Sequence, residues 1–271
     1  SCLWPAVMVA QCDPSREAVE APARPVAPAR PLLVINPHAL GNRLGARTHA
    51  RRLLEMLVRY GLEPDVCLEP DLQLVNRRLH AAVQAGSRLV IAAGGDGTVE
   101  AVAPALVNTP TALGIIPLGT YNNLAACLHI PTDLESACQL VTSGVEKRID
   151  VGQVRTRASR RPRFFLEQAS LGLAPLLAPV GEGFQKGHWL EALRALPAAL
   201  LLEPVPMRIR LDDETWSAET LLLTVCNAPR SAAALVLAPE ARMEDGQLDL
   251  CVYAELRQAE LASMLFEFLS S

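Results

Sequence analysis

The 271-residue sequence has few aromatic residues and almost no lysine. Phe, Trp and Tyr together make up 4% of the chain, and only Lys147 and Lys186 among its 25 basic residues are lysines. The formal net charge of −4 gives no overall attraction to nucleic acid or to an anionic membrane. We therefore expect no nucleic-acid partner, and any anionic partner has to bind a local patch of positive charge.

Cysteine pairs and long apolar runs are also missing. The seven cysteines are scattered, without a C-x-x-C pair or the spacing of a Cys/His metal site. This pattern is typical of a reduced, intracellular protein without structural zinc. No apolar run reaches the roughly 20 residues that a membrane-spanning helix needs. We expect a cytoplasmic protein without a transmembrane segment, and leave open a peripheral place at the inner membrane face.

The first part of the chain alternates between short apolar runs and helical stripes. Residues 1–30, rich in Pro and Ala, are expected to form a disordered tail. The alternation that follows predicts an α/β domain over residues 31–146, with a doubly wound parallel sheet and helices on both faces. The predicted strands are residues 32–36, 64–69, 88–93 and 112–117, and the predicted helices are residues 46–60, 72–85, a segment ending at 107, 122–128 and 133–143. The first helix is expected to bury Leu53, Leu54, Leu57 and Val58.

The second part, residues 147–271, contains mainly strand-like segments and predicts an antiparallel β domain. Two helices are expected in it, at residues 188–202 and 261–269. The strand-like segments are residues 149–156, 163–172, 205–211, 220–227, 235–239 and 247–253.

A glycine-rich loop follows the third predicted strand. Its residues are Gly94, Gly95, Asp96, Gly97 and Thr98. Glycine lets backbone N–H groups approach a ligand closely, and a helix beginning at such a loop favours an anion. A carboxylate beside phosphates is electrostatically costly unless it binds a metal ion or accepts a proton. Asp96 is therefore a candidate for one of these two roles. The alternative is a tight turn in which Asp96 or Thr98 caps a helix.

Two more polar turns follow neighbouring strands. Gly119, Thr120 and Asn122 come after the fourth strand, and Asn36 comes after the first. In a parallel sheet these turns share the carboxyl edge, where ligands bind, and two glycine cradles there suit a triphosphate. Alternatively, Asn122 is a helix N-cap and Asn36 forms an Asx turn. The chain has neither a Walker A loop nor G-x-G-x-x-G, which argues against an ordinary P-loop or dinucleotide fold.

Together these residues resemble the diacylglycerol kinase catalytic-domain family, which includes bacterial lipid kinases and sphingosine kinases and is related to NAD kinases. The similarity covers about residues 32–253. NAD kinases share GGDGT but lack the PLGT-x-N-x-x-A and D-G-x-L-D motifs, so the lipid-kinase branch is preferred. The segments that carry the resemblance are GGDGTVEAV, PLGTYNNLA, IDVGQV, FFLEQASLGLAP and APEARMEDGQLDL.

The resemblance implies a C-terminal β-sandwich and a site for ATP and Mg²⁺ in the cleft between the domains. It implies that Asp96 is the catalytic carboxylate and that Asp245 helps to bind Mg²⁺, although without the resemblance an ordinary polar turn between strands is the favoured interpretation of Asp245. The implied function is ATP-dependent phosphorylation of a diacylglycerol-like lipid at a membrane surface, and a homodimer is left open. The residues implied to hold the nucleotide are Asn36, Gly94, Gly95, Asp96, Gly97, Thr98, Gly119, Thr120 and Asn122.

The sequence also departs from the family pattern. Tyr121 and Asn123 replace the more usual Gly and Asp, Ala39 replaces Ser, and Glu167 stands where Asn is frequent. Relatives continue with further strands after the last helix, so the β-sandwich is expected to be truncated here. These departures favour one alternative, a catalytically silent nucleotide- or lipid-binding relative. The other alternative left open is an NAD kinase.

A basic segment is the candidate for contact with the membrane. The hairpin predicted at residues 154–164 holds five arginines, and basic side chains are attracted to an anionic leaflet. The alternative is a solvated hairpin tip. The five are Arg155, Arg157, Arg160, Arg161 and Arg163.

Overall fold

A computed structural model describes residues 9–10, 29–37, 43–157, 159–172, 203–231 and 235–253. The helices predicted at residues 188–202 and 261–269 lie outside these described residues. The chain divides into two compact units: one holds the elements from β2 to α5, the other holds β6 and the strands from β8 onward, and β7 contributes to both.

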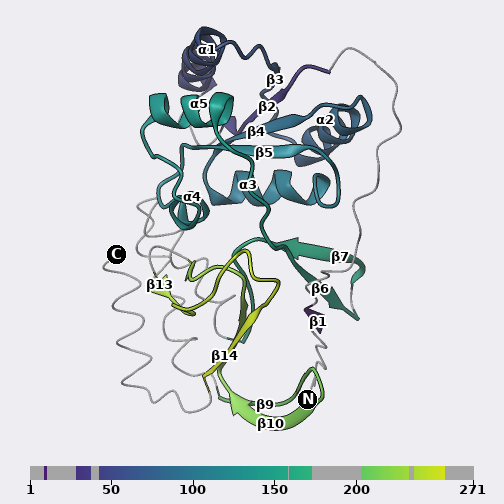
Figure 1. Cartoon of the computed structure of the whole chain (residues 1–271). Helices are drawn as coiled ribbons and strands as arrows, with labels where there is room; N and C mark the ends of the chain where they lie inside the picture. The colour runs from purple at the N-terminus through teal and green to yellow at the C-terminus, as the bar shows by residue number, and fades with distance from the viewer. Residues whose placement is uncertain are drawn as a thin grey trace. The chain divides into compact units, whose positions relative to one another are not determined.

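The first unit is built on a four-stranded parallel sheet in the order β3-β2-β4-β5 (Figure 1). The strands are β2 (Leu32–Ile35), β3 (Asp65–Cys67), β4 (Leu89–Gly94) and β5 (Ala112–Pro117). All of β2 and nearly all of β4 is buried, as expected of strands covered on both faces. The four predicted strands and their parallel arrangement are confirmed.

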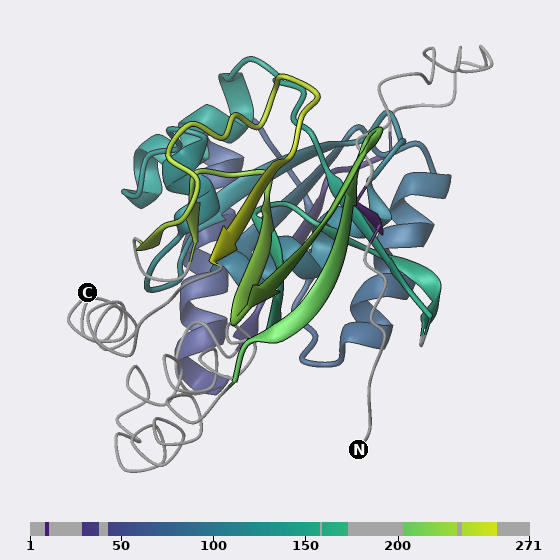
Figure 2. The same cartoon turned by 90° about the horizontal axis from the view of Figure 1, so that it is seen from below.

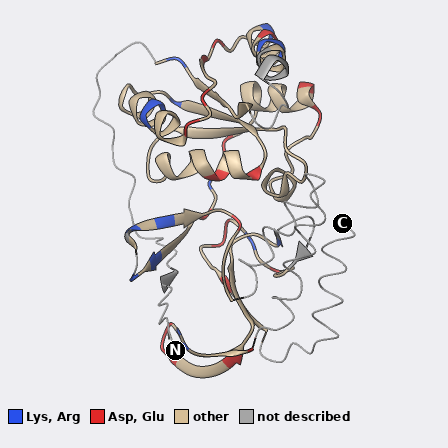
Figure 3. Cartoon of the chain, turned by 180° about the vertical axis from the view of Figure 1, so that it is seen from behind, with Lys and Arg blue, Asp and Glu red and all other residues tan. Residues whose placement is uncertain are grey.

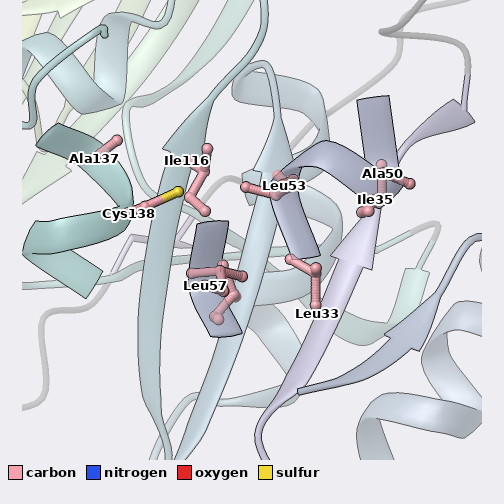
Figure 4. Packing of buried hydrophobic residues seen from close by; sticks show 10 residues of the cluster. Leu33, Ile35, Ala50, Leu53, Leu57, Ile116, Ala137 and Cys138 are labelled. Atoms are coloured by element: carbon pink, nitrogen blue, oxygen red, sulfur yellow. The ribbon is translucent and has the colours of Figure 1, made fainter. Parts of the chain in front are cut away.

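One face of this sheet is covered by α1 (Arg43–Arg59) and α5 (Leu134–Ser143) (Figure 1). Figure 4 shows their side chains meeting alternate residues of the strands, since successive strand residues point to opposite faces. Leu53 and Leu57 are fully buried in this layer. The buried set is Leu33, Ile35, Ala50, Leu53, Leu57, Ile91, Ala93, Ile116, Ala137 and Cys138.

Val58 was expected in the same stripe and is 45% exposed, so that prediction is wrong. The stripe follows Leu53 and Leu57, which are four residues apart and share one helix face. Val58 follows Leu57 directly and is therefore turned about 100° away from the sheet.

On the other face of the sheet Leu32, Val34, Val90, Ala92 and Ile115 are buried, beside α2 (Leu72–Gln84) and α3 (Asp96–Val102). Helix α2 begins at a cap, where the side chain of Asp71 accepts a hydrogen bond from the N–H of Gln73 at 2.8 Å. The helix predicted to reach residue 107 is shorter: α3 ends at Val102 and a 3₁₀ turn, Ala103–Ala105, follows. Pro104 lies in that turn, and a proline cannot donate the hydrogen bond that would continue the α-helix.

The strands of the second unit form small antiparallel sheets. The central one has the order β14-β11-β8, with β8 (Gln168–Gly172), β11 (Leu222–Cys226) and β14 (Asp249–Tyr253). The long ribbon of β9 (Val205–Leu211) and β10 (Glu214–Thr220) is a second (Figure 2). A short pair, β12 (Arg230–Ser231) and β13 (Leu235–Val236), is a third.

A further sheet has the order β1-β6-β7, with β1 (Val9–Ala10), β6 (Gly152–Thr156) and β7 (Ser159–Phe165). The segment 163–172, expected as one strand, is divided between β7 and β8, which belong to different sheets. Between them the carbonyl of Glu167 accepts hydrogen bonds from the N–H groups of Asn227 and Ala228, at 2.8 and 3.0 Å. Val9–Ala10 pairs with β6, although the sequence placed these residues in an unstructured tail.

Candidate functional site

The carboxyl ends of β2, β4 and β5 bring three of the predicted turns together. Gly94 pairs in register with Pro117, and the N–H of Leu118 donates to the carbonyl of Gly94 at 2.9 Å. On the other side of β4, the N–H of Asn36 donates to the carbonyl of Ala93 at 3.3 Å. Because parallel neighbours end at one edge, the turns at Asn36, Gly94 and Gly119 lie on the same edge of the sheet, as the sequence predicted.

The two glycine loops touch each other through their backbones at Gly95 and Gly119. A Cβ atom on Gly119 would lie 2.4 Å from the Cα of Gly95 and 2.9 Å from the side-chain oxygen of Asn122. A Cβ atom on Gly95 would lie 3.0 Å from the Cα of Gly119. These two glycines are therefore required by close approach of the loops, because neither position has room for a side chain.

Asp96 links the first loop to the helix that follows the second. Its two carboxylate oxygens accept hydrogen bonds from the N–H groups of Asn123, at 3.1 Å, and Leu124, at 3.2 Å. These are the first residues of α4 (Asn123–Cys127). The carboxylate thus caps α4 from 27 residues away, where a negative charge at a helix start is favourable. The alternative prediction, that Asp96 caps a helix, is confirmed, but the helix it caps is α4 and not α3, which begins at Asp96 itself.

Asn122 closes the second loop upon itself. Its side-chain oxygen accepts from the N–H of Gly119 at 2.9 Å, and its amide nitrogen donates to the carbonyl of Gly119 at 2.8 Å. The residue has φ of 50°, the left-handed region that Asn tolerates better than most residues. It stands at the N-cap position of α4 but makes no side-chain cap bond. The side-chain cap predicted as its alternative role is therefore wrong.

The middle of the first loop offers polar groups and open space. Gly97 is exposed, and a Cβ atom built on it would have no neighbour within 4 Å. Thr98 is 7% exposed, and its hydroxyl has no hydrogen-bond partner among the described residues. Thr98 packs so closely over Gly94 that a Cβ atom there would overlap its side chain. In the second loop, Thr120 is exposed.

Glu100 is a residue of this edge that the sequence reasoning missed. It lies one helical turn after Asp96 on α3, so the two carboxylates share a helix face. Partial desolvation raises the pKa of Glu100, and the nearby charge of Asp96 raises it further. The four-residue spacing within GGDGTVE was the available signal.

Asp245 lies in the second unit, in an exposed turn before β14. One of its carboxylate oxygens accepts from the N–H of Gln247 at 3.0 Å, and Gly246 follows with φ of 73°. This is the geometry of a polar turn. Across the described residues, no group of three or more His, Cys, Asp or Glu side chains is arranged to hold a metal ion. The assignment of Asp245 to Mg²⁺ stays a prediction.

In the part of the chain that the structure describes, no helix has both the length and the apolar character needed to cross a membrane.

Comparisons with known proteins agree with this arrangement. The family described as "Diacylglycerol kinase catalytic domain" matches residues 30–154, and the "YegS C-terminal NAD kinase beta sandwich-like domain" matches residues 185–270. A protein of Pectobacterium atrosepticum named "Probable lipid kinase YegS-like" is 32% identical over 228 residues, which cover 82% of this chain and 73% of that protein.

The diacylglycerol kinase of Bacillus subtilis is 34% identical over 199 residues, 69% of this chain. The match spans only 61% of that relative's length. A crystal structure of a diacylglycerol kinase from Bacillus anthracis has the same fold, with a TM-score of 0.66 at 21% identity over 91% of this chain and 79% of the other. The chain described here therefore belongs to the diacylglycerol kinase catalytic-domain family.

Proposed function

We propose that the chain is an ATP-dependent lipid kinase that phosphorylates the hydroxyl of a diacylglycerol-like lipid. The observation that carries this proposal is the junction of Gly95 with Gly119, which places two glycine loops and Asp96 at one sheet edge in a chain of this family. We assign nucleotide binding to residues 31–146 and lipid binding to residues 147–271. Because the acceptor is a membrane lipid, the protein would act at the membrane surface.

The residues at this edge fit a triphosphate. The open space at Gly97 lets a phosphate oxygen approach the backbone, and the buried hydroxyl of Thr98 is a donor that no described residue accepts from. The first N–H groups of a helix have no partner within that helix, which adds donors at the start of α3. Asn36 and Thr120 flank the same edge.

The same edge supplies oxygen ligands of the kind that Mg²⁺ prefers. Mg²⁺ is commonly held by one or two carboxylates together with substrate phosphates and waters. Asp96 and Glu100 provide carboxylates here. When bound, ATP supplies the phosphoryl group and Mg²⁺ neutralises charge on the phosphates.

In the proposed mechanism Asp96 accepts the proton of the lipid hydroxyl. The hydrogen bonds from Asn123 and Leu124 fix the orientation of its carboxylate, so little reorganisation is needed during the reaction. The amides of the glycine loops stabilise negative charge that develops on the transferred group.

The test is Asp96→Asn in an assay of labelled phosphate transfer from ATP to diacylglycerol in detergent micelles. Loss of a positioned general base lowers the rate by about 100-fold to 10,000-fold. Nucleotide affinity and the thermal midpoint of the same variant separate lost chemistry from a lost fold, since Asp96 also caps α4. An Asn variant with the full wild-type rate would remove Asp96 from this role.

The second candidate function is that of an NAD kinase, because the C-terminal match is to an NAD kinase-like β-sandwich. The same assay with NAD in place of lipid decides between the two acceptors. Nucleotide binding without transfer to either acceptor would instead support the catalytically silent relative.

A further inference from the structure

We propose that the hairpin of β6 and β7 is the surface by which this protein docks on an anionic bilayer. We define the arginine ribbon as Arg155, Arg157, Arg161 and Arg163, which are exposed in this hairpin. The inference deepens the proposed function and rests on it, because only a membrane-borne acceptor gives the protein a reason to bind a bilayer.

The ribbon concentrates positive charge in one short element. Residues 152–165 contain five arginines and no Asp or Glu, so the rest of the chain carries a formal charge of −9. Figure 3 shows the blue of basic residues along this hairpin. An anionic surface therefore attracts this hairpin and repels the net negative charge of the rest of the chain. The two effects together would orient the protein as it approaches the surface.

The hairpin geometry keeps these side chains at the surface. Strand β6 ends at Thr156 and β7 begins at Ser159, so two residues form the turn and Arg157 is one of them. Arg161 and Arg163 are two positions apart in β7 and therefore point to the same face of the strand.

Among the described residues, no acidic side chain forms an ion pair with an arginine of the ribbon. The ion pairs among the described residues are Arg30–Glu63 and Arg51–Glu55, and neither involves the ribbon. Arg155 donates from its Nε to the side-chain oxygen of Gln153 at 3.2 Å, a neutral partner that leaves its charge uncompensated. The ribbon thus offers exposed guanidinium groups to a partner.

The chemistry of the ribbon favours a bilayer over nucleic acid. Single-stranded nucleic acid is bound by basic grooves with exposed aromatic side chains on which bases stack. No aromatic residue lies among the arginines from Arg155 to Arg163; beyond them Phe164 is half-buried and Phe165 is 7% exposed. Guanidinium groups without stacking partners suit the phosphates of lipid headgroups, whose attraction is mainly electrostatic.

The experiment measures binding of the full chain, without nucleotide, to vesicles of equal parts phosphatidylglycerol and phosphatidylcholine. The test variant is Arg155→Gln, Arg157→Gln, Arg161→Gln and Arg163→Gln combined. Removing four arginines near the surface is expected to lower the partition coefficient on the order of 1,000-fold, at about 1 kcal/mol for each arginine. The control removes the same charge from four exposed arginines of the first unit, Arg52, Arg59, Arg77 and Arg88.

A loss confined to the ribbon variant supports the proposal, as does weaker binding of the wild-type chain to pure phosphatidylcholine. An equal loss in both variants would overturn it, because net charge alone would then explain binding. It would also be overturned if the ribbon variant lost affinity for a labelled single-stranded DNA but kept its affinity for the vesicles.

The outcome is independent of the proposed kinase activity, since vesicle binding needs no phosphate transfer. Ribbon-dependent binding in a protein that phosphorylates no lipid would support docking and overturn the proposed function. If the protein phosphorylates lipid but its binding to vesicles is unchanged in the ribbon variant, the docking proposal is wrong and the proposed function is unaffected.

Discussion

The two glycine loops at the sheet edge are held in different ways. The second loop is closed by its own residue, since both polar atoms of the Asn122 side chain bond to Gly119. In the first loop the carboxylate of Asp96 bonds outside its own loop and caps the helix that follows the second loop. The two loops are therefore held together as one rigid site. The second loop has a fixed shape of its own, and the first is attached to it through Asp96 and through the contact of Gly95 with Gly119.

The largest effect is expected where the two loops touch. In Gly119→Ala the new Cβ would lie 2.4 Å from the Cα of Gly95, so one backbone has to move. Such overpacking typically costs about 1–3 kcal/mol, and we expect the upper part of that range with loss of nucleotide binding. Denaturant unfolding and a nucleotide-binding titration measure the two losses.

The matched control is Gly97→Ala in the first loop, where the added Cβ has no neighbour within 4 Å. Its free energy of unfolding should change much less than that of Gly119→Ala. Equal destabilisation by the two substitutions would mean that close approach of the loops is not what Gly119 provides.

The next effect comes from the carboxylate that joins the loops. Asp96→Ala removes both hydrogen bonds to the start of α4, and loss of a cap costs about 1–2 kcal/mol. Asp133→Ala is the comparison, because exposed Asp133 caps α5 through one hydrogen bond from Ser136 at 2.8 Å. We expect the smaller loss there, measured by denaturant unfolding at pH 7.

The hydrogen bond from Ser136 lowers the pKa of Asp133. A lowered pKa in the folded state gives stability that is present above the ordinary Asp pKa and is lost as the pH falls through the folded value. The difference between wild type and Asp133→Ala should therefore shrink in acid. A larger loss at Asp133 than at Asp96 would show that the link between the loops adds nothing beyond an ordinary cap.

The sequence was sufficient for the parts of this site that depend on local pattern. Buried apolar runs predicted β2 and β4, and parallel order placed the turns at Asn36, Gly94 and Gly119 on one edge. What it could not supply is the partner of Asp96, because a contact over 27 residues depends on how two loops pack. A rule based on neighbouring residues would choose Asn122 as the side chain that caps α4, but the capping side chain is that of Asp96.

Two other differences have causes that periodicity does not reveal, the first local and the second long-range. Pro104 ends α3 early despite an apolar pattern that continues to residue 107. The segment 163–172 reads as one strand, yet the chain changes sheets around Glu167, where the carbonyl is used by Asn227 and Ala228 from a distant segment. Composition predicts that a segment is extended, but not which sheet it joins.

A third prediction separates the two contributions of Asn122 to its loop. Asn122→Gly and Asn122→Ala both lose the bonds to Gly119, but only Ala also has to adopt φ of 50°. A left-handed residue with a Cβ costs about 1 kcal/mol, so Ala should be less stable than Gly by about that amount. Thermal unfolding of both variants tests this, and equal midpoints would mean that the loop does not keep its left-handed turn.

The smallest effect is expected at Glu100, which interacts with the first loop through charge repulsion from Asp96. Its pKa is raised by desolvation and then by Asp96, so the folded state favours the protonated carboxyl, and that stability is lost as the pH rises through the folded pKa. Glu100→Gln should therefore be slightly more stable than wild type at pH 8, by less than about 0.5 kcal/mol, and equal to it near pH 4. Glu146→Gln, at an exposed position after α5, is the control. Because Asp96 is one cause of the shift, the gain should shrink in an Asp96→Ala background, and a gain that stays the same there would separate Glu100 from the loop.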